Sequence, residues 1–357
     1  MKGRKDTMKA ARLHAVGNFT VDKVAIPVPQ GKELLVKIGA CGVCGSDIPR
    51  IYRHGTSNQR YPLTLGHEFA GTIVAVGEDA DSALIGKRGG FYPLIPCMKC
   101  RSCQSGHYAM CEDYDYMGSR RDGGFAEYCL VPDAWNFVES RNPDTTMQAL
   151  AMLEPACVAQ HAVRKSGIFA GANVLIFGAG PIGLMAGRWA KLAGARHILF
   201  SDTVPAKIDF ARKLGFDAAN AAEDSFNDRV RRCFDGEAAD IAIEGTGYGS
   251  ALNQAIECCK AFGHITLLGN PAGDTAISRH CHSLLLRKEI TVAGIWNSHY
   301  ADIPLNEWKH TVYMMDQGLF TCDDLVSHTS SLDDLPSLIA AIYDRSIVSW
   351  KALCTVS

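Results

Sequence analysis

Short stretches of alternating apolar and polar residues, separated by clusters of glycine, proline and aspartate, run through the first 150 residues. Alternation with a period of two, combined with β-branched and aromatic side chains, is typical of half-buried strands, and the clusters between them are turn signals. The pattern therefore predicts a mostly β unit, with strands at residues 33–40, 72–76 and 125–131.

From residue 158 the pattern changes to apolar runs that alternate with helical segments, which is typical of a parallel sheet covered by helices. Helices are expected at 184–192 and 250–262, and the residues after 295 return to a mixed pattern. Including a weaker strand at 217–219, the pattern predicts the six strands of a doubly wound sheet, at 173–177, 197–201, 217–219, 240–244, 264–268 and 289–295.

Length and composition narrow the class of protein. A chain of 357 residues exceeds one ordinary core, and 47% hydrophobic with 21% charged residues excludes wholesale disorder. A formal net charge of -2, without a basic stripe, argues against nucleic acid or an anionic membrane as a partner.

The location of the protein is predicted to be cytoplasmic. No apolar run is long enough to cross a bilayer, and the basic start lacks the apolar core of a secretory signal. Fourteen cysteines are then expected to be thiols or metal ligands rather than disulfides. Met8 has the look of an alternative beginning, so the first seven residues are expected to be a disordered extension.

A glycine-rich turn follows the strand at 173–177 and opens the helix that comes after it. Its glycines allow a tight turn, a close approach of pyrophosphate and close packing of helix on strand, while the helix N-terminus attracts the phosphates. Asp202 follows the next strand, at the distance of an acidic ribose partner that would repel a 2′-phosphate, so NAD is favoured over NADP. The alternative is a glycine turn of another α/β domain. The predicted cofactor residues are Gly178, Gly180, Pro181, Ile182, Gly183, Asp202, Thr246 and Gly269.

Sulfur, nitrogen and oxygen donors occur in three separate segments, as Cys44, the pair His67 and Glu68, and Glu154. Zinc accepts all three donor types, and in catalytic sites it leaves one position open. The alternative is that His67 and Glu68 are a loop pair without a metal.

Four further cysteines, Cys97, Cys100, Cys103 and Cys111, lie on a short polar excursion. Their spacing is typical of a closed tetrahedral zinc site, which holds a loop with too little core to fold alone. An iron–sulfur cluster also uses four cysteines, but the fourth is not followed by the proline of the bacterial cluster run. Structural zinc is therefore favoured over a cluster or free thiols.

The order of these motifs resembles that of the zinc-dependent medium-chain dehydrogenases, from Met8 over essentially the whole chain. Leu153-Glu154-Pro155 is similar to the polyol-dehydrogenase branch, where a glutamate replaces a second cysteine. The segments 47–51, 118–128 and 286–289, with Gly294 and Trp296, are similar to members that act on a polyol phosphate.

The resemblance implies a GroES-like catalytic domain over residues 1–157 and 295–357, with a zinc lobe at 97–111, and a Rossmann domain over 158–294. It also implies two zinc ions per chain. The catalytic ion would be held by Cys44, His67, Glu68 and Glu154, and one of the two glutamates would be able to yield when substrate enters.

The implied reaction is NAD-dependent oxidation of a secondary hydroxyl. Ser46 is expected to take the hydroxyl proton, although it could instead cap a turn. Many relatives continue this relay through a histidine where this chain has Pro49, and His54 is only a loose substitute.

The expected substrate is a polyol phosphate bound by Arg50, Arg120 and Arg121, since guanidinium groups match phosphate oxygens. Arg120 and Arg121 could instead be a solvated loop or pair with Asp122. Trp296 and Asn297 are expected on the facing wall, although Trp296 could equally serve packing.

Two other functions stay open at this point. A free polyol such as sorbitol or altritol would need the same chemistry, and a zinc-dependent nucleic-acid binder is a remote alternative. The resemblance implies a homodimer or homotetramer, since members of the family form both. The buried-looking strand at 289–295 ends the sheet, and an edge strand there could pair across a two-fold axis.

Overall fold

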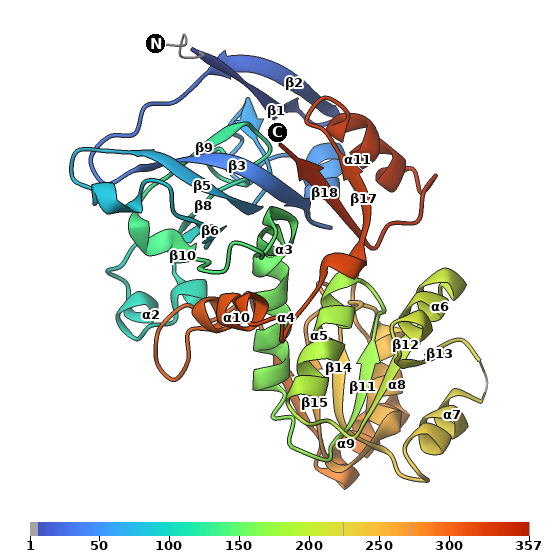
Figure 1. The fold of residues 1–357 in the computed structure, drawn as a ribbon. Helices are drawn as coiled ribbons and strands as arrows, with labels where there is room; N and C mark the ends of the chain where they lie inside the picture. Colours follow the sequence, from blue (N-terminus) through green and yellow to red (C-terminus); the bar gives the residue numbers. More distant parts are fainter. Residues whose placement is uncertain (1–5, 224, 272, 357) are drawn as a thin grey trace. The chain divides into compact units, whose positions relative to one another are not determined.

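The computed structural model describes residues 6–223, 225–271 and 273–356, and it divides into two compact units (Figure 1). The first unit comprises Met1–Glu154 and His299–Ser357, and the second comprises Pro155–Ser298. The functional domain ranges 1–157 with 295–357 and 158–294 stay a prediction.

The larger sheet of the first unit has the strand order β10-β6-β5-β3-β18-β17, and β9 also pairs with β3. Apolar side chains such as Ile38, Phe69 and Phe91 are buried beside it in the core of this unit. Its strands are β3 (Leu34–Val43), β5 (Glu68–Val76), β6 (Arg88–Phe91), β9 (Tyr128–Val131), β10 (Phe137–Glu139), β17 (Val326–Ser330) and β18 (Lys351–Thr355).

A smaller sheet has the order β2-β1-β4, and β7 pairs with β8. The bounds are β1 (Thr7–Ala15), β2 (Asn18–Ala25), β4 (Leu63–Thr64), β7 (Leu94–Ile95) and β8 (Asp115–Tyr116). Thr7 already pairs with Ala25, so the predicted disordered extension is too long at its end. Residues 1–5 of that extension lie outside the described residues.

Short helices connect these strands, and α10 attaches the C-terminal segment to the rest of the first unit. Asp316, at the end of α10, accepts hydrogen bonds from Ser140 Oγ at 2.6 Å, Arg141 N at 2.8 Å and Thr145 Oγ1 at 2.8 Å. The helices are α1 (Asp47–Pro49), η1 (Arg50–His54), η2 (Ser82–Leu84), α2 (Arg101–Gln104), η3 (Tyr108–Met110), η4 (Ala134–Asn136), α3 (Met147–Ala151), α10 (Glu307–Asp316), η5 (Asp323–Leu325) and α11 (Leu335–Tyr343). Helix α4 (Leu153–Lys165) begins in the first unit and continues into the second.

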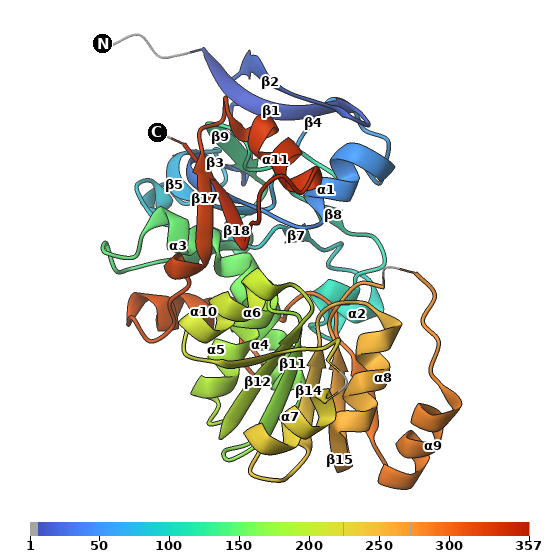
Figure 2. The same cartoon turned by 90° about the vertical axis from the view of Figure 1, so that its right-hand side faces the viewer.

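The second unit is built on a parallel sheet of order β13-β12-β11-β14-β15-β16, which confirms the predicted doubly wound class. Figure 2 shows α5 and α8 on opposite sides of this sheet. The strands are β11 (Asn173–Phe177), β12 (His197–Asp202), β13 (Asp217–Asn220), β14 (Ala239–Glu244), β15 (Cys259–Leu267) and β16 (Thr291–Gly294). The helices are α5 (Pro181–Leu192), α6 (Pro205–Lys213), α7 (Phe226–Cys233), α8 (Gly249–Cys258) and α9 (Arg279–Lys288).

Several predicted elements of this unit have different ends, most clearly α8, β15, which begins at Cys259 instead of 264, and β16. Helix α8 stops at Cys258, because Cys259 pairs with Ala239 in the sheet and Phe262 has a φ of 61°, which no right-handed helix accommodates. The last strand begins only at Thr291, after Glu289 ends α9 in the left-handed conformation. This strand was predicted to be buried, but Val292 is 38% exposed.

Within the described residues, no helix combines the length and the apolar character that a membrane span needs.

Candidate functional site

Two neighbouring strands of the first unit bring the predicted metal donors together. Gly42 of β3 and Glu68 of β5 are antiparallel partners. Cys44, just after β3, and His67, just before β5, therefore meet at the same end of the strand pair. Gly66 precedes His67 with a φ of +92°, and a Cβ there would come within 2.7 Å of Cys41 Sγ and the Phe125 ring, so only glycine fits this approach.

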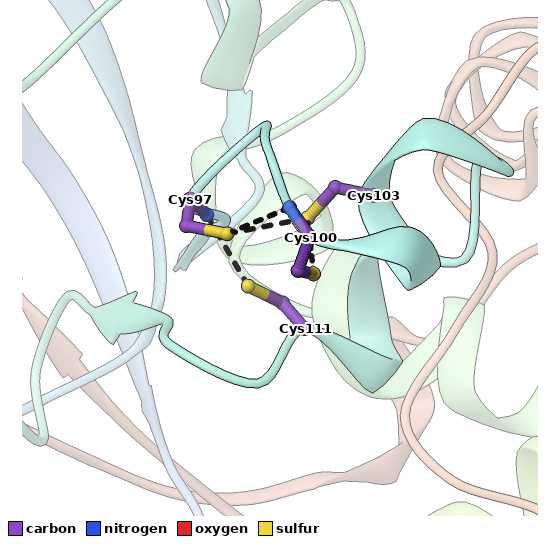
Figure 3. A group of neighbouring side chains, drawn as sticks. All are labelled: Cys97, Cys100, Cys103 and Cys111. Atoms are coloured by element: carbon purple, nitrogen blue, oxygen red, sulfur yellow. Dashed lines mark hydrogen bonds between the residues drawn. The ribbon is translucent and has the colours of Figure 1, made fainter.

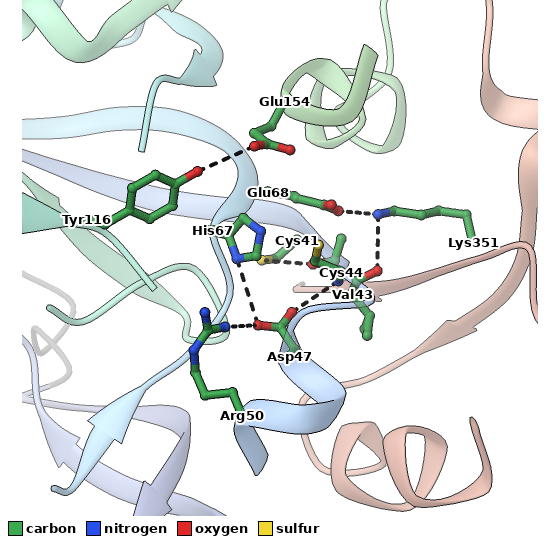
Figure 4. A network of polar contacts seen from close by, with 11 residues as sticks. Cys41, Val43, Cys44, Asp47, Arg50, His67, Glu68, Tyr116, Glu154 and Lys351 are labelled. Carbon is green, nitrogen blue, oxygen red and sulfur yellow. Dashed lines mark hydrogen bonds and ion pairs between the residues drawn. The ribbon is translucent and has the colours of Figure 1, made fainter. Parts of the chain in front are cut away.

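The donor atoms of Cys44, His67 and Glu68 lie within 4.8 Å of one another. Figure 4 shows the three side chains. His67 is 4% and Glu68 is 2% exposed. Glu154 is also buried and lies near His67, and Tyr116 Oη donates to its Oε1 at 3.4 Å. The structure thus gathers the predicted ligands in one buried place, with Glu154 outside the tightest group.

Asp47 supports this donor group, and the sequence motifs did not assign it a role. It is fully buried, and its Oδ2 accepts a hydrogen bond from Cys44 N at 3.0 Å, while its Oδ1 accepts one from Arg50 Nη1 at 3.0 Å. The same Oδ1 is 3.7 Å from His67 Nδ1, a buried atom without a hydrogen-bond partner. Asp47 therefore faces the histidine on the side away from Cys44 and favours a proton on Nδ1.

Lys351 is the second residue that sequence reasoning missed. It begins β18, whose next residue, Ala352, pairs with Val43, and its Nζ donates to Glu68 Oε2 and, at 3.0 Å, to Val43 O. The side chains of Lys351 and Glu68 are 4% and 2% exposed. A Cβ at Gly42 would come within 2.1 Å of Glu68 Oε2, so this glycine makes room for the ion pair.

Charge and burial together make this group a good fit for a divalent cation. When His67 is neutral, as a metal ligand must be, four members of the group are anionic once the thiol is ionised, and among the described residues Lys351 and Arg50 are their cationic partners. The buried group then has a formal charge of about -2, which is costly away from water unless a cation neutralises it. The anionic members are Cys44, Asp47, Glu68 and Glu154.

The pKa values of the group without a metal reflect the same electrostatic cost. Burial raises the pKa of Glu154 to about 7, although the charge of His67 opposes this shift. Burial lowers the pKa of His67, but the charges of Cys44 and Asp47 outweigh burial and raise it to about 10. Protons therefore occupy this group when a metal does not, and a bound metal would displace them.

The four-cysteine lobe brings its sulfur atoms together (Figure 3). Cys103 Sγ lies 3.5 Å from Cys100 Sγ and 4.0 Å from Cys97 Sγ. A tetrahedral zinc site with bonds of about 2.3 Å requires sulfur separations of about 3.8 Å. Cys97 N donates to Cys111 Sγ at 3.2 Å, and such backbone N–H groups lower the pKa of Cys100 to about 6. None of the four cysteines forms a disulfide, and their sulfur separations and backbone donors fit a tetrahedral zinc site in a lobe with only short helices.

The glycine turn of the second unit has the shape that pyrophosphate binding requires. Gly178 has a φ of +98°, and a Cβ at Gly183 would come within 2.0 Å of Gly178 O. Pro181 follows Gly180 as the first residue of α5, and Ile182 comes next, so free N–H groups of the helix start point out of the turn. A Cβ at Gly180 would meet nothing within 4 Å, which leaves open space at the helix start.

Asp202 and Glu244 hold the loops around this turn. Asp202 lies at the end of β12 and accepts hydrogen bonds from Ala179 N and Val204 N, each at 2.9 Å. Glu244, buried at the end of β14, accepts from Thr246 N at 2.6 Å and Gly247 N at 3.0 Å. A Cβ at Gly269 would come within 2.3 Å of Gly247 N, so the predicted cofactor loops also pack closely.

Three of the predicted substrate residues, the arginines, already have partners within the protein. Arg50 pairs with Asp47, and Arg120 donates to Tyr114 O at 2.5 Å and lies 3.9 Å from the Tyr114 ring centroid. Arg121 Nε lies 3.3 Å from Asp115 Oδ2, not beside the neighbouring Asp122. Trp296 is 50% exposed in the second unit, followed by Asn297, and Ser46 is exposed at the start of α1 without a capping hydrogen bond.

Comparison with known proteins agrees with this geometry. The alcohol dehydrogenase GroES-like domain matches residues 30–141, and the zinc-binding dehydrogenase domain matches residues 181–315. Galactitol 1-phosphate 5-dehydrogenase of Escherichia coli K12 is 32% identical over 94% of this chain and 96% of its own. L-galactonate-5-dehydrogenase of the same strain is 31% identical over 92% of both chains.

A solved structure, a zinc-binding dehydrogenase from Sinorhizobium meliloti 1021 bound to NADP, is 31% identical. It superposes with a TM-score of 0.85 over 98% of this chain and 100% of its own. Fold and site thus define a zinc-dependent oxidoreductase with a nucleotide cofactor. More particularly, the chain belongs to the medium-chain dehydrogenase family, among the relatives of alcohol and polyol dehydrogenases.

Proposed function

We propose that the protein oxidises a secondary hydroxyl of a polyol phosphate, similar to galactitol 1-phosphate, to the ketose phosphate with NAD. The main support is the buried donor group of Cys44, His67, Glu68 and Glu154, whose negative charge one divalent cation would balance. The same chemistry on a free polyol, such as sorbitol or altritol, is the second candidate, because a sorbitol dehydrogenase of Bombyx mori is 29% identical over 91% of this chain, only slightly less similar than the polyol-phosphate enzyme.

The reaction depends on groups that the protein binds and on residues that handle the proton. Zinc would supply the Lewis acid that makes the alcohol acidic, and NAD the hydride acceptor. Ser46 would take the hydroxyl proton, and its exposed position at the start of α1 supports this role. Pro49 cannot pass the proton on, so its exit runs through solvent or His54, which is exposed.

The two glutamates would have different roles. Glu68 lies nearest to Cys44 and His67 but shares its carboxylate with Lys351. Glu154 has a weaker partner, the Tyr116 hydroxyl at 3.4 Å. We therefore assign Glu68 as the ligand that yields, because Lys351 offers it a partner when it leaves, and Glu154 as the ligand that stays.

Structural zinc in the lobe of Cys97, Cys100, Cys103 and Cys111 completes the proposed pair of zinc ions per chain. The catalytic domain would comprise 1–157 and 295–357 and the NAD domain 158–294. NAD is favoured over the NADP of the Sinorhizobium meliloti protein, because the Asp202 carboxylate would repel a 2′-phosphate.

Substrate choice is tested with a panel of polyols and polyol phosphates, followed by NADH absorbance. The double variant Arg120→Ala with Arg121→Ala is expected to raise KM for a polyol phosphate and leave KM for a free polyol unchanged. The control is Arg141→Ala, since Arg141 is 86% exposed. Equal effects on both substrates would remove the phosphate role of Arg120 and Arg121.

Self-association through the second unit is also part of the proposal. β16 is the edge strand of the parallel sheet, and its backbone N–H and C=O groups on the outer side can pair with another strand. Three apolar side chains near it are exposed, namely Leu286 (68%), Val292 (38%) and Trp296 (50%). A two-fold pairing of β16 strands would cover them in a homodimer, on which a homotetramer could build. The cytoplasmic location stays a prediction.

A further inference from the structure

A cavity of about 260 Å³ lies in the first unit, between the small sheet and the segment that precedes and includes β9. Among the described residues that line it are Met8 and Arg12 of β1, and Arg121 and Tyr128. None of the proposed metal donors lines this cavity. It is therefore separate from the metal-donor group, although it shares Arg121 with the proposed phosphate-binding residues of the substrate site.

Part of the lining of this cavity is apolar, and we call this part the apolar floor. Met8 and Ala126 are buried in a small hydrophobic cluster that also includes Ala10, with Tyr128 packed against it. Met8, Ala10 and Arg12 alternate along β1 and therefore point to the same face of the strand. The guanidinium group of Arg12 thus follows directly on the apolar floor.

Three arginines line the cavity, and they keep unused donors. Arg12 Nη2 donates to Pro62 O at 3.1 Å and Nη1 is 4.0 Å from Asp22 Oδ2, but the buried Nε has no hydrogen-bond partner. Arg60 is exposed, and within the described residues its guanidinium makes no hydrogen bond or ion pair. Arg121 uses its Nε towards Asp115, which leaves its terminal amino groups.

Two carboxylates also line the cavity, and both accept backbone hydrogen bonds. Asp122 Oδ1 accepts from Thr64 N at 2.9 Å, and Glu33 Oε2 accepts from Gln30 N at 3.1 Å. Neither has an arginine of the cavity within ion-pair distance among the described contacts. Among the described contacts, the Nε of Arg12 and the guanidinium of Arg60 are thus donors without a partner, and such donors match the oxygens of an oxyanion.

We propose that this cavity binds a small phosphate monoester, with its oxygens on Arg12 and Arg60 and its organic part on the apolar floor. A concave apolar site with a few convergent polar groups is the usual form of a small-molecule site. The cavity wall is also connected to the donor group, because Gly123 N donates to Thr64 O at 3.0 Å and Gly124 N to Gly66 O at 2.7 Å, directly before His67.

Binding is tested on the zinc-loaded protein by titration calorimetry with phenyl phosphate, inorganic phosphate and phenol. Phenyl phosphate carries no oxidisable alcohol, so the measurement is independent of the proposed reaction. We expect it to bind more tightly than inorganic phosphate, because its ring would cover the apolar floor, and phenol to bind far more weakly.

Arg12→Gln and Arg60→Gln are each expected to weaken phenyl phosphate binding about tenfold or more. The control variant Arg141→Gln removes the same charge from an exposed position of the same unit and is expected to bind like wild type. Arg60 is exposed, so its replacement leaves the fold intact, which thermal unfolding verifies for every variant. Unchanged binding by Arg60→Gln, or no binding at about 10 mM, overturns the proposal.

Two sources share this chemistry, the phosphate end of a substrate and a separate phosphate monoester. Competitive inhibition by phenyl phosphate against a polyol phosphate, lost in Arg60→Gln, identifies the first source. Binding without competition identifies the second, and either result supports the site.

Discussion

At the scale of single residues, Lys351 acts directly on the donor group without being a proposed ligand. It places a buried positive charge against Glu68, a residue 283 positions earlier in the chain. In a buried pair, each charge is stabilised mainly by the other, because water is absent. Lys351 thereby competes with a metal for the Glu68 carboxylate.

Replacement of Lys351 is expected to have opposite effects on the metal-free and zinc-loaded protein. Lys351→Met should lower the free energy of unfolding of the metal-free protein by about 3–5 kcal/mol, because Glu68 stays buried without a partner. Zinc should dissociate more slowly, because Lys351 no longer competes with it for the Glu68 carboxylate. Urea unfolding and zinc release into a chelator measure the two effects.

The matched control for Lys351 is Lys351→Arg, which keeps the charge and should restore most of the stability. If zinc leaves Lys351→Met as fast as it leaves wild type, Lys351 does not regulate Glu68.

The raised pKa of Glu154 makes the stability of the metal-free protein depend on pH. Its carboxyl pKa is about 7 in the folded protein, above the usual value of 4.5, so the folded state binds the proton more tightly. This stabilisation is complete below about pH 4.5 and decreases by about 3 kcal/mol as pH rises to about 7. Chemical unfolding at a series of pH values measures it.

Glu154→Gln, which cannot ionise, should lack this part of the pH dependence, so the difference from wild type isolates it. A constant difference between the two proteins from pH 4.5 to 7 would contradict the assigned shift. In zinc-loaded protein the ion replaces the proton, and the decrease should disappear.

Asp202 is expected to determine the preference for NAD. Asp202→Ala removes hydrogen-bond acceptors for the ribose hydroxyls and a charge that repels a 2′-phosphate. We expect kcat/KM with NAD to fall about 10- to 100-fold, and kcat/KM with NADP to rise or stay unchanged. Initial rates with both nucleotides measure the ratio, and Asp209→Ala, at an exposed position in α6, is the control. Equal losses with both nucleotides would show that Asp202 only shapes the turn.

At the scale of elements, local sequence patterns predicted the strands of the second unit better than its helices. The apolar run of β11 and the glycine turn before α5 are short-range signals, and the structure confirms both. The residues from Cys259 to Phe262 belong to a strand and not to a helix, because Cys259 pairs in the sheet with Ala239. This partner lies 20 positions earlier in the chain. Sequence pattern contains no such long-range information.

The four-cysteine lobe behaves as an element that a metal holds together. Cys100→Ser is expected to lose one zinc ion per chain and to unfold at lower temperature, because the lobe contains only short helices. Elemental analysis and thermal unfolding measure both, and Cys129→Ser, a buried free thiol outside the lobe, is the control. Iron with a brown chromophore would replace the zinc assignment by a cluster.

At the scale of the whole molecule, the exposed edge at β16 predicts self-association. Val292→Lys puts a charge on the edge strand, and a buried unpaired charge in a two-fold interface is costly. We expect the variant to be a monomer in light scattering at concentrations where wild type is a dimer or larger. Val74→Lys, at a 38% exposed position of the first unit, is the control. A monomeric wild type would refute this part of the proposal.

By itself, the sequence determined the family and the order of the elements and indicated the types of the proposed metal ligands, because spacing motifs such as Cys97 to Cys111 and the Gly178 turn act over short distances. It also contained Cys44, His67 and Glu154, and the predicted ligands do converge. Only the tertiary structure decided which charges face them. The pairing of β18 with β3 brings Lys351 to Glu68, and the fold of α1 turns Asp47 towards His67. Such contacts depend on the register of strands distant in sequence, for which no local pattern exists.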